Sequence, residues 1–154
     1  MNPSFFTDTD FPTAPRSFFV LDIDGTLVVD GEKTAGSAVR EAVRRLKKHH
    51  TVCIASNGKN RARNESLAHA LRVPYVAGTK PFGKITAAIH LMNTAHLPIV
   101  VVGDRSLTDG LLAIRIAGVF VPVKPLRTGS ELWHTKAAYA LDAMIARVIH
   151  TIGY

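Results

Sequence analysis

Carboxylates stand at the ends of two apolar runs of the chain. Asp22 and Asp24 end the run that begins at residue 17, and Asp104 and then Asp109 follow the run that begins at residue 97. Carboxylates that gather at one place repel one another unless a cation neutralises them. Oxygen ligands suit Mg²⁺, a hard ion that usually keeps several waters and shares a substrate phosphate. The pattern therefore predicts a magnesium site at which a phosphate group can bind.

A hydroxyl and a lysine follow apolar runs in two further segments. Ser56, Asn57 and Gly58 follow the run TVCIA, and Lys80 follows a short run that a proline opens. Ligands of open α/β sheets bind at the carboxyl ends of the strands. We therefore expect these side chains to meet the carboxylates at one edge of a sheet, with Lys84, one helical turn later, as the alternative to Lys80.

The elements that position these residues are expected to alternate along the chain. Runs that are apolar throughout predict buried strands at 17–23, 51–55, 74–77, 97–102 and 119–123. Apolar residues at helical spacing predict helices at 37–48, 61–71, 82–94, 107–116 and 131–149. This alternation predicts an α/β fold, a three-layer α/β/α sandwich around a mainly parallel five-stranded sheet.

The composition is that of a globular domain with an excess of positive charge. The 154 residues are 47% hydrophobic and carry a net charge of +7. The size predicts one domain, 17–154, after an irregular leader of residues 1–16 that contains three prolines. The charge favours anionic partners, and we expect a phosphorylated substrate or an anionic lipid surface rather than nucleic acid.

Neither a targeting signal nor a membrane span is expected. The N-terminus has no basic region and contains aspartates, and no run approaches about 18 apolar residues. Cys53 is the single cysteine, which excludes an intramolecular disulfide and a multi-cysteine zinc site. A cytoplasmic location is the prediction.

Four motifs in this order resemble those of the haloacid dehalogenase superfamily, in its phosphatase branch. They are D-x-D-G-T at 22–26, S-N-G at 56–58, K-P at 80–81 and G-D-x-x-x-x-D at 103–109. The resemblance covers about residues 18 to 123, and each motif stands at the end of a predicted strand. It implies a Rossmann-like fold and a Mg²⁺-dependent phosphomonoester hydrolase that works through an aspartyl phosphate.

The resemblance also implies a role for each matching residue. Asp22 would be the nucleophile, and Asp24 the general acid and then the base for the hydrolytic water. Ser56 would bind a phosphoryl oxygen, and Lys80 would neutralise the transferring group and hold Asp22. Mg²⁺ would be bound by the Asp22 carboxylate, the Asp24 carbonyl and Asp104, with Asp109 as a partner of the metal waters or of Lys80. Substrate contacts are expected from Gly25, Thr26, Asn57, Gly58, Lys59 and Arg61, with Arg63 as a further candidate.

The chain leaves no room for a cap domain after the first motif or between the second and third. Such an open site suits a substrate larger than the pocket, or a homo-oligomer in which a neighbouring subunit forms the lid. The segments SNGKNR, KPFGK and GDRSLTDGLLAIRIAG are similar to the capless class IIIA phosphatases, which include phosphatidylglycerophosphate phosphatases. This chain has Asp-Gly-Thr where those enzymes often carry Asp-Asn-Thr.

Two helices bear on the expected substrate. The helix at 37–48 carries five basic residues, Arg40, Arg44, Arg45, Lys47 and Lys48, and the helix at 131–149 carries an apolar stripe. These features fit peripheral contact with an anionic membrane and a phosphatidylglycerophosphate-like substrate. A solvated basic face and a stripe packed on the sheet are the simpler alternatives. A general small-molecule phosphatase and a non-catalytic phosphate-binding scaffold remain the alternative functions.

Overall fold

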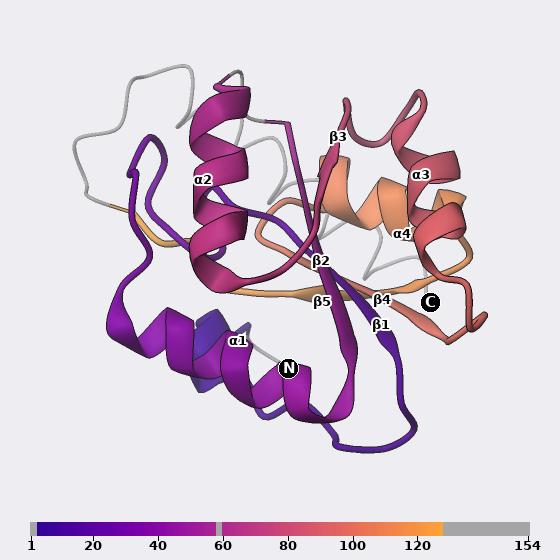
Figure 1. Ribbon diagram of the computed structural model, residues 1–154, viewed down its shortest axis with the longest axis horizontal. Helices are drawn as coiled ribbons and strands as arrows, with labels where there is room; N and C mark the ends of the chain where they lie inside the picture. Colours follow the sequence, from indigo (N-terminus) through magenta and orange to yellow (C-terminus); the bar gives the residue numbers. More distant parts are fainter. Residues whose placement is uncertain (1–2, 58–59, 128–154) are drawn as a thin grey trace.

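The computed structural model describes residues 3–57 and 60–127, and it confirms the predicted α/β architecture (Figure 1). Five strands form one sheet in the order β3-β2-β1-β4-β5, and all four pairings are parallel. The strands are β1 (Phe18–Leu21), β2 (Thr51–Ser56), β3 (Tyr75–Ala77), β4 (Ile99–Gly103) and β5 (Val119–Pro122). The helices are α1 (Ser37–His49), α2 (Arg61–Leu71), α3 (Ile85–Met92) and α4 (Leu111–Arg115).

The helices cover both faces of the sheet, with α1 and α2 on one side and α3 and α4 on the other (Figure 1). Successive residues of a strand point to opposite faces, so each central strand must be apolar on both. In β1, Phe19 and Leu21 join the core beneath α1 and α2, whereas Phe18 and Val20 join the core beneath α3 and α4. All four are at most 2% exposed. This two-sided burial explains the continuous apolar runs of the sequence.

Helix α1 turns one apolar face to the core and a basic face away from it. The buried positions Val39, Ala42, Val43 and Leu46 recur at helical spacing. Three of its five Arg and Lys side chains form hydrogen bonds or ion pairs within the protein. Arg40 donates to the Ala35 carbonyl, Arg44 pairs with Glu41, and Lys47 donates to the carbonyls of Leu71 and Arg72.

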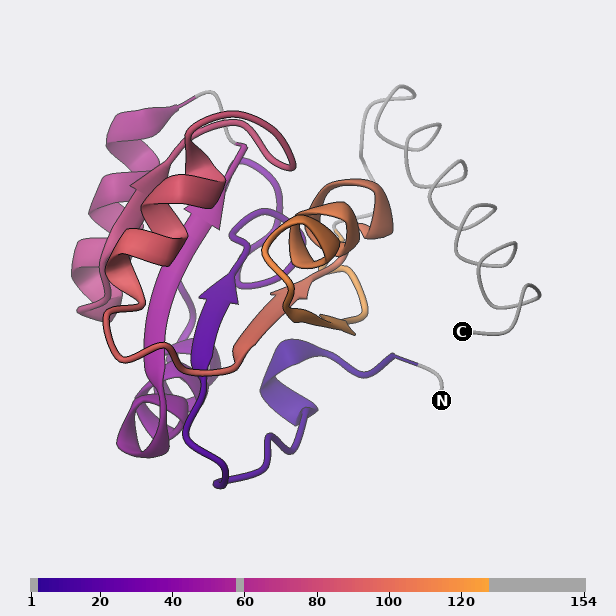
Figure 2. The ribbon, with the colours of Figure 1, turned by 90° about the vertical axis from the view of Figure 1, so that its right-hand side faces the viewer.

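The predicted leader is irregular in its backbone but packs into the fold. Residues 3–16, the described part of the leader, contain one short 3₁₀ turn, Phe6–Asp8, and the Phe6 side chain is only 2% exposed. Phe11 meets Phe19 of β1 edge to face at 5.3 Å between ring centroids. A cavity of about 260 Å³ remains between the leader and α1. Residue 16 is therefore no boundary of the hydrophobic core. The ribbon of Figure 2 shows the leader folded back beside the sheet before it enters β1.

Several element boundaries differ from the prediction. The first strand ends at Leu21 rather than at residue 23, and the third helix begins at Ile85 rather than at 82, after Gly83 with φ +83°. The helix predicted at 107–116 is a π-helical segment, Ser106–Gly110 (η2), followed by the short α4. The helix predicted at 131–149 lies outside the described residues. Within the described part of the chain, no helix has the length and hydropathy to span a membrane.

Cys53 is expected to be inert to thiol reagents while the protein is folded. Its side chain is fully buried in β2, and burial raises the pKa of the thiol to about 12. At pH 8 the thiolate, which is the reactive form, is therefore scarce as well as inaccessible. We expect reaction with Ellman's reagent to be at least about 100-fold slower in buffer than in denaturing urea. Equal rates under the two conditions would contradict the packing of β2.

Candidate active site

The carboxyl edge of the sheet gathers the polar residues that the sequence singled out. Asp22 follows β1 directly, Ser56 is the last residue of β2, and Asp104 follows β4. Lys80 lies in the loop after β3, and Asp109 lies in η2. Because all five strands are parallel, these segments end at the same edge. The predicted convergence of these residues is thus a consequence of the observed topology.

Three carboxylates form a buried cluster at this edge. Oxygen atoms of Asp22, Asp104 and Asp109 lie within 4.8 Å of one another. The three residues are 7%, 9% and 0% exposed. The sequence predicts Asp109 as a partner of the metal waters or of Lys80, and the structure confirms the contact with Lys80 and also places Asp109 inside the acidic cluster. The carboxylate of Asp24 is not a member of this cluster.

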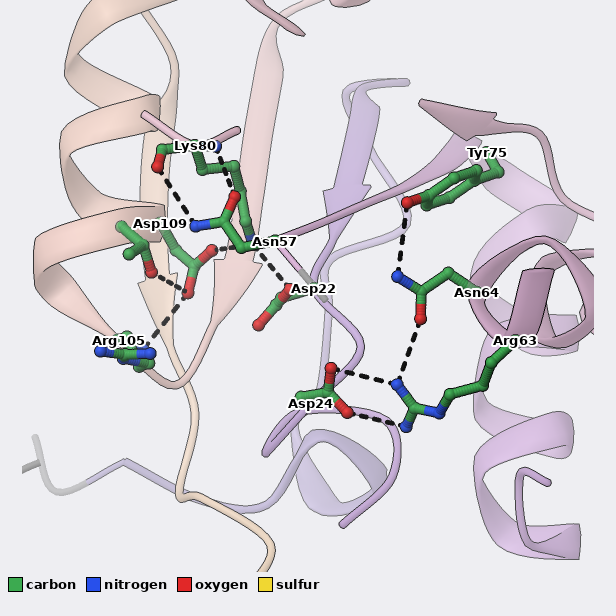
Figure 3. Close-up of polar contacts among 10 residues, drawn as sticks. Asp22, Asp24, Asn57, Arg63, Asn64, Tyr75, Lys80, Arg105 and Asp109 are labelled. Carbon is green, nitrogen blue, oxygen red and sulfur yellow. Dashed lines mark hydrogen bonds and ion pairs between the residues drawn. The ribbon is translucent and has the colours of Figure 1, made fainter. Parts of the chain in front are cut away.

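Lys80 bridges two members of the cluster (Figure 3). Its Nζ donates to Asp22 Oδ1 at 2.6 Å and to Asp109 Oδ1 at 2.5 Å, and the residue is 4% exposed. Lys84 directly precedes α3, and its side chain is exposed. Of the two lysines that the sequence left open, Lys80 is therefore the one that lies in the site.

The charges of the cluster shift one another's protonation. Burial alone would lower the pKa of Lys80, but the adjacent Asp109 and Asp22 carboxylates outweigh it and raise that pKa. Burial raises the pKa of Asp109 to about 6, against the opposing effect of Lys80. Lys80 and Asp109 thus favour each other's charged form, against the burial that disfavours both charges.

Asn57 fixes the loop that carries Lys80. Its Nδ2 donates to the Lys80 carbonyl at 3.1 Å, and its Oδ1 accepts from the Lys80 backbone N–H at 2.5 Å. These bonds join the end of β2 to the segment after β3, across 23 residues of sequence. The substrate contact expected of Asn57 stays a prediction, and the structure adds that its side chain holds Lys80. Gly58 and Lys59 lie outside the described residues.

Asp24 contacts a different cation from Asp22. Its carboxylate forms a two-pronged ion pair with Arg63, with Nη2 to Oδ1 at 2.7 Å and Nη1 to Oδ2 at 3.1 Å (Figure 3). Asp24 lies beyond β1, which ends at Leu21, and the chain turns after it at Gly25 with φ +81°. Arg61 does not join the site in this structure, since it pairs with Glu65 on the exposed surface of α2.

The D-G-T turn is buried beneath this edge of the sheet. Gly25 donates to the Val28 carbonyl at 2.8 Å, and its own carbonyl accepts from Leu126 at 2.7 Å. Thr26 is 1% exposed, and its hydroxyl makes no hydrogen bond within the described residues. Ser56 is 3% exposed. The contacts of Gly25, Thr26 and Ser56 with a substrate therefore remain predictions.

Gly103 leaves the space that the Asp109 carboxylate occupies. A Cβ added to this residue would overlap the Asp109 side chain. We expect Gly103→Ala to displace Asp109 from Lys80 and to lower the stability by about 1–3 kcal/mol through overpacking. Urea unfolding measures the loss, with Gly36→Ala as the control, because a Cβ at Gly36 meets no atom within 4 Å. A stability loss no larger than that of the control would contradict the geometry.

The donor set of the cluster fits a hard divalent cation. All three side chains offer carboxylate oxygens, which are the ligands that Mg²⁺ prefers in proteins. Oxygen atoms of the three groups lie within 4.8 Å of one another, and a cation bound among carboxylates this close would offset their mutual repulsion. Asp22 and Asp104 belong to the predicted metal set, and Asp109 is a further candidate ligand.

The fold and the site together define a three-layer α/β sandwich with an acidic, lysine-bridged site at the carboxyl edge of its sheet. Comparison of the chain with protein-family models, with curated proteins and with solved structures gave no match.

Proposed function

We propose that the protein is a Mg²⁺-dependent phosphomonoester hydrolase that forms an aspartyl phosphate on Asp22. The observation that carries the proposal is the Asp22–Lys80 ion pair inside a buried cluster of three carboxylates. A lysine beside a carboxylate can neutralise a dianionic phosphoryl group while the carboxylate attacks it. The four motifs that resemble the haloacid dehalogenase phosphatases supply the same assignment from the sequence.

In the first step, an Asp22 carboxylate oxygen attacks phosphorus and the bond from phosphorus to the ester oxygen breaks. Asp24 gives a proton to that leaving oxygen, so an alcohol departs. In the second step, Asp24 takes a proton from water, the water oxygen attacks phosphorus, and Asp22 is released with inorganic phosphate. Lys80 offsets the charge of the phosphoryl oxygens throughout. When bound by Asp22, Asp104 and the Asp24 carbonyl, Mg²⁺ would supply further positive charge at these oxygens.

The substrate class that we propose is a phosphorylated lipid head group of the phosphatidylglycerophosphate kind. The net charge of +7 favours an anionic surface. Within the described residues, the segment between β1 and α1 and the segment between β2 and β3 are short, and neither forms a separate lid domain. The engaged side chains of Arg40, Arg44 and Lys47 favour the alternative, a phosphatase of soluble esters, because fewer α1 cations remain for a membrane.

Phosphate release tests the proposal directly. The purified protein should hydrolyse p-nitrophenyl phosphate with Mg²⁺ and lose this activity in EDTA. Absence of turnover under both conditions would favour the non-catalytic scaffold. For the substrate class, vesicles that contain phosphatidylglycerophosphate are compared with glycerol 3-phosphate at low salt. Faster hydrolysis of the soluble ester, without co-sedimentation with the vesicles, would exclude the lipid and leave the phosphatase.

Mg²⁺ is expected to support activity and Ca²⁺ to inhibit it. Mg²⁺ holds octahedral geometry at about 2.0–2.1 Å, whereas Ca²⁺ accepts more ligands at about 2.3–2.6 Å. A looser shell would let Asp22 bind the ion with both oxygens and lose its position for attack. Rates with p-nitrophenyl phosphate are measured at equal concentrations of the two ions, and equal rates would contradict this expectation.

A further inference from the structure

Arg63 binds Asp24 beside the candidate site, and the proposed reaction does not use it. It lies in the first turn of α2, where Asn60 caps the helix by accepting from the Arg63 backbone N–H at 3.0 Å. The cap fixes where the side chain leaves the helix. The side chain of Arg63 is only 8% exposed, so the guanidinium is directed inward rather than toward solvent.

The guanidinium of Arg63 joins three parts of the chain. Two of its nitrogens bind the two oxygens of Asp24, and Nε donates to the Glu32 carbonyl at 2.6 Å. Asp24 Oδ1 also accepts from the backbone N–H of Gly31 at 3.4 Å. Arg63 therefore ties α2 both to Asp24 and to the loop that returns from it.

A second set of contacts joins Arg63 to Asn64 of α2 and, through Asn64, to Tyr75. Nη1 also donates to the side-chain oxygen of Asn64 at 3.1 Å, and Asn64 Nδ2 donates to the Tyr75 hydroxyl at 3.4 Å (Figure 3). Asn64 is fully buried and Tyr75 lies in β3. The position of the guanidinium thus depends on the packing of α2 against the sheet.

We propose that Arg63 is a positioning residue that sets the place of the Asp24 carboxylate relative to Asp22. Asp24 lies beyond the end of β1, on a turn at Gly25, so the sheet itself does not fix its side chain. A planar guanidinium that binds both carboxylate oxygens fixes their orientation as well as their distance. The inference rests on the proposed function for the role of Asp24 as proton donor to the leaving oxygen.

The consequence for the reaction depends on the leaving group. Proton donation contributes most when the departing oxygen is strongly basic and least when it leaves readily as an anion. Phenolate is more basic than p-nitrophenolate, so a misplaced Asp24 should impair hydrolysis of phenyl phosphate more than that of p-nitrophenyl phosphate. Substrate binding should change little, because Arg63 holds Asp24 and not the phosphate.

The test compares Arg63→Gln and Arg63→Lys with Arg72→Gln, which removes one charge from the exposed C-terminal end of α2. For Arg63→Gln we expect kcat/KM with phenyl phosphate to fall about ten-fold or more and kcat/KM with p-nitrophenyl phosphate to fall less than about three-fold. The ratio kcat/KM is compared because it reports transfer from the ester alone, whereas kcat also contains the hydrolysis of the aspartyl phosphate, which is the same for both esters. The inhibition constant of inorganic phosphate should stay within about two-fold, because Arg63 does not bind the phosphate. Arg63→Lys should recover little of the activity with phenyl phosphate. An ammonium group cannot bind both carboxylate oxygens of Asp24 and the Glu32 carbonyl together. Arg72→Gln should match the wild type.

Three results would overturn the inference. They are an equal loss of kcat/KM with the two esters, weaker inhibition by inorganic phosphate at unchanged kcat/KM ratios, and full recovery with Arg63→Lys. Hydrogen exchange tests the inference without turnover. The backbone amides of residues 24–32 should exchange faster in Arg63→Gln than in Arg72→Gln. Equal exchange in the two variants would contradict a role of Arg63 in holding Asp24. A wild type that hydrolyses neither ester would contradict the proposed function, while the exchange result would still decide whether Arg63 holds Asp24.

Discussion

Replacement of Asp22 by asparagine is expected to lower kcat with p-nitrophenyl phosphate by more than about 10³-fold, or about 4 kcal/mol of barrier. The amide has no anionic oxygen to attack phosphorus, so no aspartyl phosphate can form. The fold should persist, because asparagine is nearly isosteric and the backbone N–H at this position still donates to the Val102 carbonyl. Phosphate release and circular dichroism of the purified variant measure the two effects.

The same variant also tests the metal assignment. Loss of one carboxylate relieves repulsion within the cluster but removes a ligand, so the rise of Tm caused by Mg²⁺ should shrink. Glu41→Gln serves as a control, because Glu41 pairs with Arg44 on the exposed face of α1, away from the site. Appreciable hydrolysis by folded Asp22→Asn would exclude Asp22 as the nucleophile.

Replacement of Lys80 by methionine is expected to abolish turnover and to destabilise the protein at neutral pH. The ammonium is the shared partner of Asp22 and Asp109, and its removal leaves buried carboxylates facing one another. Breaking a buried ion pair by removing one partner typically costs about 3–5 kcal/mol. Urea unfolding in EDTA measures this loss without a contribution from bound metal.

The destabilisation by Lys80→Met should diminish toward acid pH. The pKa of Asp109 is already raised to about 6 by burial, so the ionised acid costs stability above pH 6. In the unfolded chain the pKa of an aspartate is near 4. As the pH falls from about 6 toward 4, Asp109 of the folded protein takes up a proton and this cost declines. Without Lys80 the cost of ionisation is larger, and unfolding at pH 5 should differ less from wild type than unfolding at pH 7.5.

Lys84→Met is the matched control for Lys80→Met. Lys84 lies one helical turn later and is exposed, so its loss should leave both turnover and stability close to those of the wild type. Loss of activity in Lys84→Met with retention in Lys80→Met would reverse the assignment of the lysine. Equal stability of Lys80→Met and the wild type at pH 7.5 would contradict the buried ion pairs.

The residues that lie directly at strand ends could be placed from the sequence. Apolar runs that alternate with amphipathic stretches predicted a parallel sheet, and the structure has one. In such a sheet the residues after β1, β2 and β4 must share an edge, so the convergence of Asp22, Ser56 and Asp104 followed from the pattern alone. The roles of these residues in catalysis stay predictions.

The tertiary structure decided everything that depends on loops and on contacts distant in sequence. Lys80 rather than Lys84 enters the site because Asn57, 23 residues earlier, binds its peptide group. Asp24 turns to Arg63, 39 residues later, although it stands two residues from Asp22. Phe6 of the leader is buried, and Phe11 is partly buried, because α1 and β1 offer them a common surface. Hydrophobic periodicity reports which face of an element is buried, but it carries no information on where a loop side chain finds its partner. Only the packed chain brings those partners together.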